Sequence, residues 1–196
     1  MKKPQLIDLI RRVSELTGIP QPIIVGSQSL YAFTDTVPEI VLRSHEADFM
    51  LADGGIEAIR MVNDQLGVSS DFPDVTGYYA DGLGLATVVL VPGWRDRLRP
   101  FVDEQEQVIA LCLEVHDAAV SKLMAGRDKD WPFIKALLDG GLISLPTLAE
   151  RAALIQETAH EDALLPRLNK LIEHLRRQFR AEELRPLTEL AAQLSA

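Results

Sequence analysis

The chain opens with a helical pattern of apolar residues and continues with short apolar runs. Leucine, isoleucine and valine recur every three or four positions between Pro4 and Thr17, which predicts an amphipathic helix that Gly18 ends. Short runs bounded by turn residues predict strands. The expected strands cover residues 22–25, 46–51, 75–80, 85–91 and 107–113, and two further helices in this part cover residues 28–33 and 56–66.

Two further features of the pattern concern a hairpin and the C-terminal helices. Asp81-Gly82 separates the third and fourth apolar runs, which is typical of a β-hairpin with a primed turn. From Asp117 onward we expect helices only, and an apolar stripe from Leu164 to Leu175 with Arg and Lys opposite it is typical of a core or a partner surface. These helices cover residues 117–125, 130–138, 146–156, 162–179 and 181–194. The pattern predicts an α+β fold: a small mixed sheet flanked by helices, with a C-terminal helical extension.

The first candidate for chemistry is Gly26-Ser27, which directly follows the expected strand at residues 22–25. A strand that runs through Gly-Ser into a helix start presents unpaired N–H groups and the positive helix end to an anion. Gly26 and Ser27 are therefore candidate ligands of nucleotide phosphates. The alternative is that they form only a turn and a helix N-cap.

The second candidate is the acidic pair in Glu46-Ala47-Asp48. Side chains alternate along a strand, so Glu46 and Asp48 share one face about 7 Å apart, and hard oxygen ligands at that spacing suit Mg²⁺. The alternative is a pair of solvated charges at a strand end. Acidic pairs at this spacing recur at residues 104/106 and 128/130, so the order carries the argument: the Gly-Ser turn comes first, a helix follows, and the pair comes next.

Composition narrows the class of protein. With 196 residues, 47% of them hydrophobic and 25% charged, the chain is ordinary for a globular protein of one domain with or without a helical extension. The single cysteine, Cys112, lies in an apolar run and is interpreted as core, which fits a reducing compartment. The N-terminus has no signal-peptide pattern, and no apolar run reaches the length of a membrane span. We expect a cytoplasmic protein without a membrane partner.

The net charge of −9 disfavours broad, nonspecific binding to nucleic-acid backbones. A local basic patch remains compatible with this charge. Arg95, Arg97 and Arg99 alternate after Trp94, and they are either a phosphate or RNA contact or plain surface charge.

These motifs, together with the block from His116 to Asp130, resemble the minimal nucleotidyltransferases of the DNA-polymerase-β-like superfamily. The block contains Lys122, Arg127 and Asp130 in a Lys-x-x-x-x-Arg-x-x-Asp arrangement. The chain is most similar to the AbiEii-type branch, which includes toxins of toxin–antitoxin pairs. The resemblance covers roughly residues 20 to 140, which implies a nucleotidyltransferase-like domain at residues 1–140 and a C-terminal helical extension at residues 141–196.

The resemblance implies a role for each matching residue. Gly26 and Ser27 would hold a nucleoside triphosphate, and Glu46 and Asp48 would bind Mg²⁺. Lys122 would match a helical lysine near the phosphates, and Asp130 an acidic residue at the start of the next helix. The implied reaction moves a nucleoside monophosphate to an acceptor hydroxyl on RNA, a protein or a small molecule. A cognate antitoxin is an implied partner.

The same residues are also compatible with structural roles or with a fold that has no catalytic activity. Lys122 is alternatively a helix-surface lysine, and Asp130 alternatively a helix cap. The chain departs from the superfamily by having Glu46 where an aspartate is usual, and Glu114 is the only candidate for a third carboxylate. The competing interpretation is a catalytically silent nucleotidyltransferase fold that binds a nucleotide or a protein partner.

Overall fold

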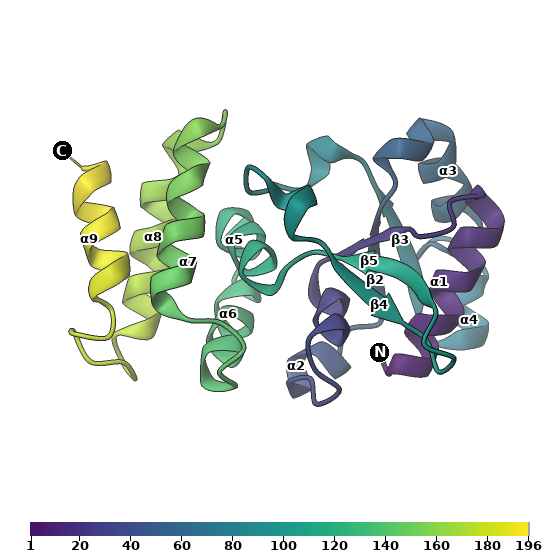
Figure 1. The fold of residues 1–196 in the computed structure, drawn as a ribbon, viewed down its shortest axis with the longest axis horizontal. Coiled ribbons are helices and arrows are strands. Elements are labelled where there is room, and N and C mark those ends of the chain that lie inside the picture. Colours follow the sequence, from purple (N-terminus) through teal and green to yellow (C-terminus); the bar gives the residue numbers. More distant parts are fainter. Residues whose placement is uncertain (196) are drawn as a thin grey trace. The chain divides into compact units, whose positions relative to one another are not determined.

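The computed structural model describes residues 1–195 and confirms the expected α+β fold (Figure 1). Contacts divide the chain into two compact units. The first unit contains residues 1–88 and 95–114, and the second contains residues 89–94 and the chain from residue 115 onward. The strands are β1 (Ile23–Val25), β2 (Glu46–Met50), β3 (Tyr79–Leu83), β4 (Arg99–Val102) and β5 (Val108–Cys112).

The α-helices of the first unit are α1 (Lys3–Thr17), α2 (Glu39–Leu42), α3 (Gly55–Leu66) and α4 (Phe72–Thr76), and those of the second unit are α5 (Val115–Ala125), α6 (Asp130–Asp139), α7 (Leu145–Ala153), α8 (Glu161–Leu175) and α9 (Arg185–Leu194). Short 3₁₀ helices are η1 (Ser27–Ala32), η2 (Ala52–Gly54), η3 (Leu85–Thr87), η4 (Trp94–Arg97) and η5 (Leu154–Glu157). No helix within residues 1–195 is long and apolar enough to cross a membrane.

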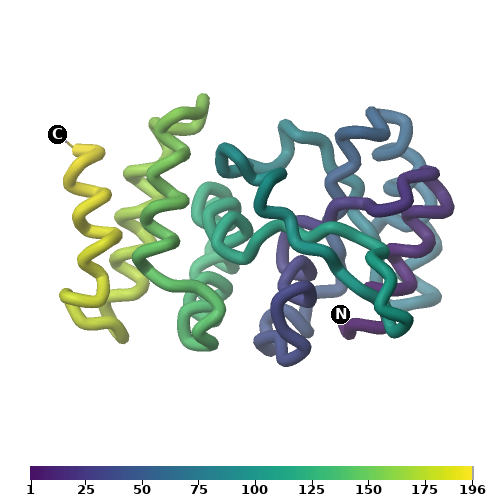
Figure 2. Tube along the Cα trace, viewed as in Figure 1, coloured from purple at the N-terminus to yellow at the C-terminus, as the bar shows by residue number. Residues whose placement is uncertain are grey.

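The sheet of the first unit is mixed and has the strand order β3-β2-β1-β5-β4. The strand β1 is antiparallel to β2 and parallel to β5, while β2 and β3 are parallel. Two segments that are far apart in the sequence thus lie side by side, since β5, in teal, pairs with β1, in purple (Figure 2). The helices α1 and α3 pack on each other and on the sheet, and α1 buries the apolar side chains that predicted it.

The expected hairpin around Asp81-Gly82 is wrong. Residues 79–83 form the single strand β3, parallel to β2, and residues 85–87 form a 3₁₀ turn. Gly82 lies in mid-strand, where the Asn63 side chain of α3 accepts its N–H at 2.6 Å and donates to its carbonyl at 3.1 Å. The helix thus supplies hydrogen-bond partners to a strand at the sheet's edge, which the Asp-Gly signal did not reveal.

The strand β4, which contains Pro100, was not expected from the sequence. It pairs with β5 in an antiparallel hairpin at the edge of the sheet, where a proline without an N–H donor is tolerated. The turn between the two strands is closed by Asp103, whose carboxylate accepts the backbone N–H groups of Gln105 and Gln107 at 3.0 Å each. Local side-chain bonds, rather than strand propensity, set this hairpin.

The second unit is a helical bundle in which α5 packs on α6, α7 and α8, and α9 on α7 and α8. The apolar stripe of α8 is core, because Leu164, Leu168, Leu171, Ile172 and Leu175 are all buried. The contacts place residues 115–140 in this unit. The expected domain division at residues 140 and 141 stays a prediction, because compactness alone does not establish which segment folds independently.

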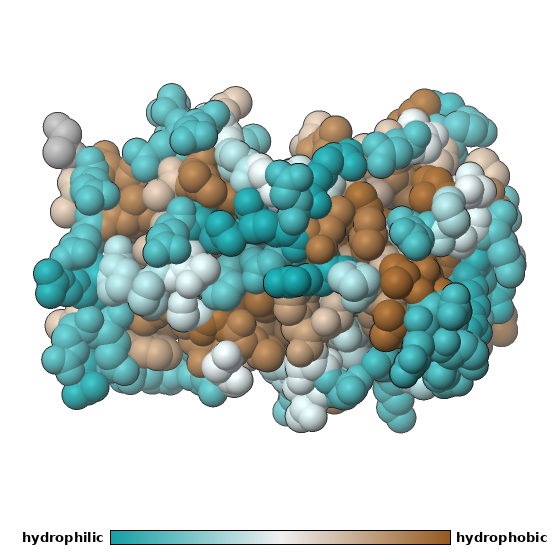
Figure 3. Space-filling model, in the orientation of Figure 1, coloured by the Kyte–Doolittle hydropathy of each residue, from teal (hydrophilic) through white to brown (hydrophobic). Residues whose placement is uncertain are grey.

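Large apolar side chains reach the surface of the described residues only in the first unit. Figure 3 shows brown surface among the hydrophilic teal on the face in view. The exposed residues are Leu42, Ile56, Val68, Val75, Leu85, Val102 and Val108.

We predict that Asn63→Ala lowers the free energy of unfolding by about 2 kcal/mol, because it leaves two backbone groups of buried Gly82 without a partner. The exposed neighbour Gln65 on the same helix provides the control, and Gln65→Ala is expected to change stability little. Denaturant unfolding of both variants measures the difference, and equal stabilities would contradict the role of Asn63.

Candidate functional site

The centre of the candidate site is the close approach of Gly26 to the carboxylate of Asp48. The antiparallel pairing of β1 and β2 places Val25 opposite Asp48. Gly26 is the next residue after Val25 and therefore lies close to Asp48. Gly26 has a φ of +73°, and a Cβ atom built on it would lie 2.0 Å from Oδ2 of Asp48. Only glycine fits there, because the backbone is left-handed and the space is already taken.

Ser27 begins η1 directly after Gly26. The expected α-helix at residues 28–33, with Ser27 as its N-cap, is instead a six-residue 3₁₀ helix with Gly26 in the cap position and no side-chain cap bond. The turn is held by Ser29, whose hydroxyl donates to the Gly26 carbonyl at 2.8 Å, and by buried Gln28, whose amide donates to Val41 at 3.2 Å. Hydrogen bonds from two polar side chains, Ser29 and Gln28, therefore hold the Gly-Ser turn in place.

The strand β2 has the expected alternation of faces. Ala47 and Phe49 are fully buried, while Glu46 and Asp48 are half-buried on the other face. Gly82, which pairs with Phe49, lies against α3. The acidic pair therefore lies on the face of the sheet opposite α3.

The neighbouring strand adds a third carboxylate. In the parallel register of β2 and β3, Tyr79 lies opposite Glu46 and Asp81 lies opposite Asp48. Burial raises the pKa of Asp81, and the negative charge of Glu46 raises it further. Three carboxylates thus share one face of two adjacent strands, beside the Gly26 turn.

Tyr79 ties the longer of the two acidic side chains to this face. Its hydroxyl donates a hydrogen bond to Oε2 of Glu46 at 3.0 Å. Burial raises the pKa of Tyr79 to about 12, with further contributions from the bond to Glu46 and from the charges of Glu46, Asp81 and Asp48. The phenol therefore remains a hydrogen-bond donor at neutral pH.

The sequence analysis missed Asp81 and Tyr79 because it assigned Asp81 to a turn. Glu114, its candidate for a third carboxylate, follows β5, which β1 separates from β2 in the sheet. The available signal was the period of two in Tyr79-Ala80-Asp81, which matches that of Glu46-Ala47-Asp48. Only the strand register shows that the two patterns lie side by side.

Lys122 and Asp130 lie in the second unit and contact each other there. Nζ of Lys122 is 3.9 Å from Oδ1 of Asp130, whose side chain is 1% exposed. Oδ2 of Asp130 accepts the backbone N–H of Arg127 at 3.0 Å, so Asp130 braces the turn before α6. Both residues therefore have a structural role within the second unit. Their roles toward a nucleotide stay predictions.

The three alternating arginines do not form a strand face. Arg95 and Arg97 belong to η4, whereas Arg99 begins β4. Arg95 forms an exposed ion pair with Asp53 at 3.2 Å. A phosphate or RNA contact by these arginines stays a prediction.

Carboxylates on the strand face are the donors available for a metal ion. Within residues 1–195, no group of three or more His, Cys, Asp or Glu side chains is placed to hold one by itself. Mg²⁺ commonly binds to proteins through one or two carboxylates and completes its shell with substrate phosphates and water. Glu46 and Asp48 fit that mode.

One family model matches residues 4–176, and its description is a nucleotidyltransferase of unknown function (DUF6036). No curated protein matches the chain. No solved structure matches it either.

We predict that Gly26→Ala destabilises the protein by at least about 2 kcal/mol more than Gly18→Ala does, because only the former places a Cβ against a carboxylate. The glycines are matched, since Gly18 has a φ of +71° and nothing within 4 Å of an added Cβ. Adding Asp48→Ala to Gly26→Ala should remove the excess cost. Urea unfolding of the variants measures it, and equal costs at the two glycines would refute the close approach.

We predict that Asp81→Asn raises the free energy of unfolding at pH 7. The pKa of Asp81 is raised in the folded protein, so the stability that this group contributes is present at low pH and is lost as the pH rises through that pKa. The gain from Asn should vanish below pH 3.8, the ordinary carboxyl value, where wild-type Asp81 is protonated in both states. Thermal unfolding from pH 3 to 7, with exposed Asp64→Asn as the control, tests the pH dependence.

Proposed function

The chain belongs to a nucleotidyltransferase family, and we propose that it transfers a nucleoside monophosphate from a nucleoside triphosphate to an acceptor hydroxyl. The observation that carries the proposal is the contact of Gly26 with the Asp48 carboxylate, beside Glu46 and Asp81. A glycine turn lets phosphate oxygens approach the backbone closely, and the carboxylates next to it are where a divalent cation would meet those phosphates.

The donor set fits Mg²⁺, since carboxylate oxygens are its preferred protein ligands. Glu46 and Asp48 would hold the ion, and when bound it would neutralise phosphate charge and polarise the α-phosphate. Tyr79 supports this by restraining Glu46, whose side chain is one methylene longer than that of aspartate. This hydrogen bond offsets the rotamer freedom of the longer side chain.

The remaining steps use the chain's own groups. The Ser27 hydroxyl and the backbone N–H groups of the Gly26-Ser27 turn bind phosphate oxygens of the triphosphate. The Asp81 carboxylate accepts the proton of the attacking hydroxyl, a task for which a raised pKa is favourable. The hydroxyl oxygen then bonds to the α-phosphorus, and pyrophosphate leaves.

The finer assignments rest on the resemblance. We propose that Lys122 stabilises phosphate charge and that Asp130 positions it, in keeping with their contact. An AbiEii-type toxin with a cognate antitoxin, in the cytoplasm, is the proposed biological setting. RNA, a protein and a small molecule remain the three acceptor classes to be distinguished.

A second candidate is a silent nucleotidyltransferase fold that binds a nucleotide or a protein partner without transfer. It is favoured by the lack, within residues 1–195, of a ready-made cluster of three metal-ligating side chains. Magnesium-dependent thermal shifts with each of the four nucleoside triphosphates report binding in either case. Binding without turnover would support the silent candidate.

Incubation with each α-labelled triphosphate and a cell lysate, with and without ribonuclease, identifies donor and acceptor class together. We predict that Asp48→Asn lowers transfer at least about a hundredfold, on the order of 3 kcal/mol, because it keeps the side-chain volume but removes the negative charge. Exposed Asp64→Asn on α3 is the control and should retain activity. Wild-type rates in Asp48→Asn would refute the site.

A further inference from the structure

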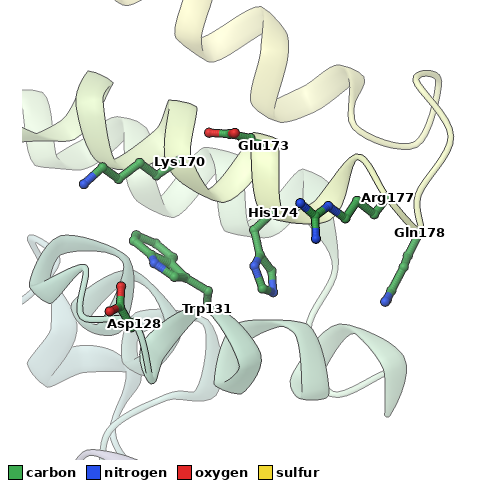
Figure 4. A pocket seen from close by; sticks show the side chains of 7 residues that line it. All are labelled: Asp128, Trp131, Lys170, Glu173, His174, Arg177 and Gln178. Carbon is green, nitrogen blue, oxygen red and sulfur yellow. The ribbon is translucent and has the colours of Figure 1, made fainter.

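The second unit has a groove between α6 and α8 that the proposed reaction does not use. Its volume is about 430 Å³. Figure 4 shows Trp131 pointing from the start of α6 toward α8, and His174 pointing from α8 toward α6. The lining residues are Asp128, Trp131, Lys170, Glu173, His174, Arg177 and Gln178.

The groove lies in a basic segment of an acidic chain. Residues 167–180 contain five Lys and Arg residues and a single acidic one, Glu173, whereas the whole chain has 20 basic and 29 acidic residues. Such a local reversal of charge attracts a polyanion to one place while the rest of the surface repels it. Lys170 and Arg177 of this segment bring positive charge to the groove, next to the carboxylates of Asp128 and Glu173.

The nitrogen-bearing side chains of the groove are available to a ligand. Lys170 and His174 lie four residues apart on α8, Arg177 follows in the turn after Leu175, and all three line the groove. Within residues 1–195 their side chains form no hydrogen bond or ion pair with protein. By contrast, the flanking Arg167 donates to the Gly126 carbonyl at 3.1 Å, and Arg180 pairs with Glu183 at 3.2 Å.

The shape and mixed polarity of the groove favour nucleotides over an acidic peptide. The imidazole of His174 and the guanidinium of Arg177 are planar groups of the kind on which unstacked bases lie, and the indole of Trp131, which is 8% exposed, lines the groove beside them. The carboxylates of Asp128 and Glu173 would repel aspartate or glutamate side chains, but they accept hydrogen bonds from the amino groups of bases. Phosphates would meet Lys170 and Arg177.

We propose that the α6–α8 groove binds a short single-stranded nucleic acid, with phosphates at Lys170 and Arg177 and a base against His174, next to Trp131. This site lies within the second unit and is distinct from the carboxylate face of the first. Binding here requires no transfer reaction, so it can be tested whether or not the proposed activity exists.

The test is fluorescence anisotropy of the full chain with labelled single-stranded RNA and DNA of about ten nucleotides, a length typical of such sites. Lys170→Glu/Arg177→Glu is expected to weaken binding at least about tenfold and to reduce the salt slope by about 1.4, for two lost phosphate contacts. The control is Arg180→Glu/Arg185→Glu, which makes the same charge change outside the groove and should retain most of the affinity.

A second readout is independent of charge. Quenching of Trp131 fluorescence by the oligonucleotide is expected, because Trp131 is the tryptophan that lines the groove. It is measured in a Trp94→Phe background. The RNA and DNA arms show which sugar is preferred. Absence of binding, equal losses in the two charge-reversed variants, or displacement of the oligonucleotide by oligoglutamate but not by unlabelled RNA or DNA would each overturn the proposal.

Discussion

The candidate site depends on one steric constraint, the contact between the backbone of Gly26 and the carboxylate of Asp48. Antiparallel pairing brings the end of β1 to the acidic strand β2, and a Cβ at Gly26 would lie 2.0 Å from the carboxylate oxygen. Because Gly26 also has a positive φ, the turn into η1 and the position of Asp48 are set together. The Gly26-Ser27 turn and the acidic strand are thus one structural element.

The acidic face is maintained at a cost to stability. Burial and, to a lesser extent, the negative charge of Glu46 raise the pKa of Asp81, which means that its ionised form is disfavoured in the fold. The opposite face compensates, because Ala47, Phe49 and Ala80 are completely buried. A sheet anchored firmly on one side tolerates electrostatic strain on the other, and such strain is typical of functional sites.

The second unit treats its charges in two ways. Asp117 and Asp130 are buried, and each is paired with a cation of the same unit: Arg151 lies 3.5 Å from Asp117, and Lys122 lies 3.9 Å from Asp130. The first pair joins α7 to α5, and the second joins α5 to α6. Lys170 and Arg177 have no such protein partners among the described residues, so their charges face solvent or a ligand.

The sequence by itself determined several of the local elements and pointed to part of the candidate site. Helical spacing predicted α1 and the helices of the second unit, and alternation predicted the faces of β2, because both depend on neighbours a few residues away. The tertiary structure decided that Asp81 belongs to a strand beside Asp48, that Gly26 contacts its carboxylate, and that Pro100 lies in an edge strand. Strand order and register arise from pairing between distant segments, which a local pattern does not contain. The dipeptide Asp-Gly looks the same in the sequence whether it forms a turn or, as here, lies in a strand that Asn63 stabilises.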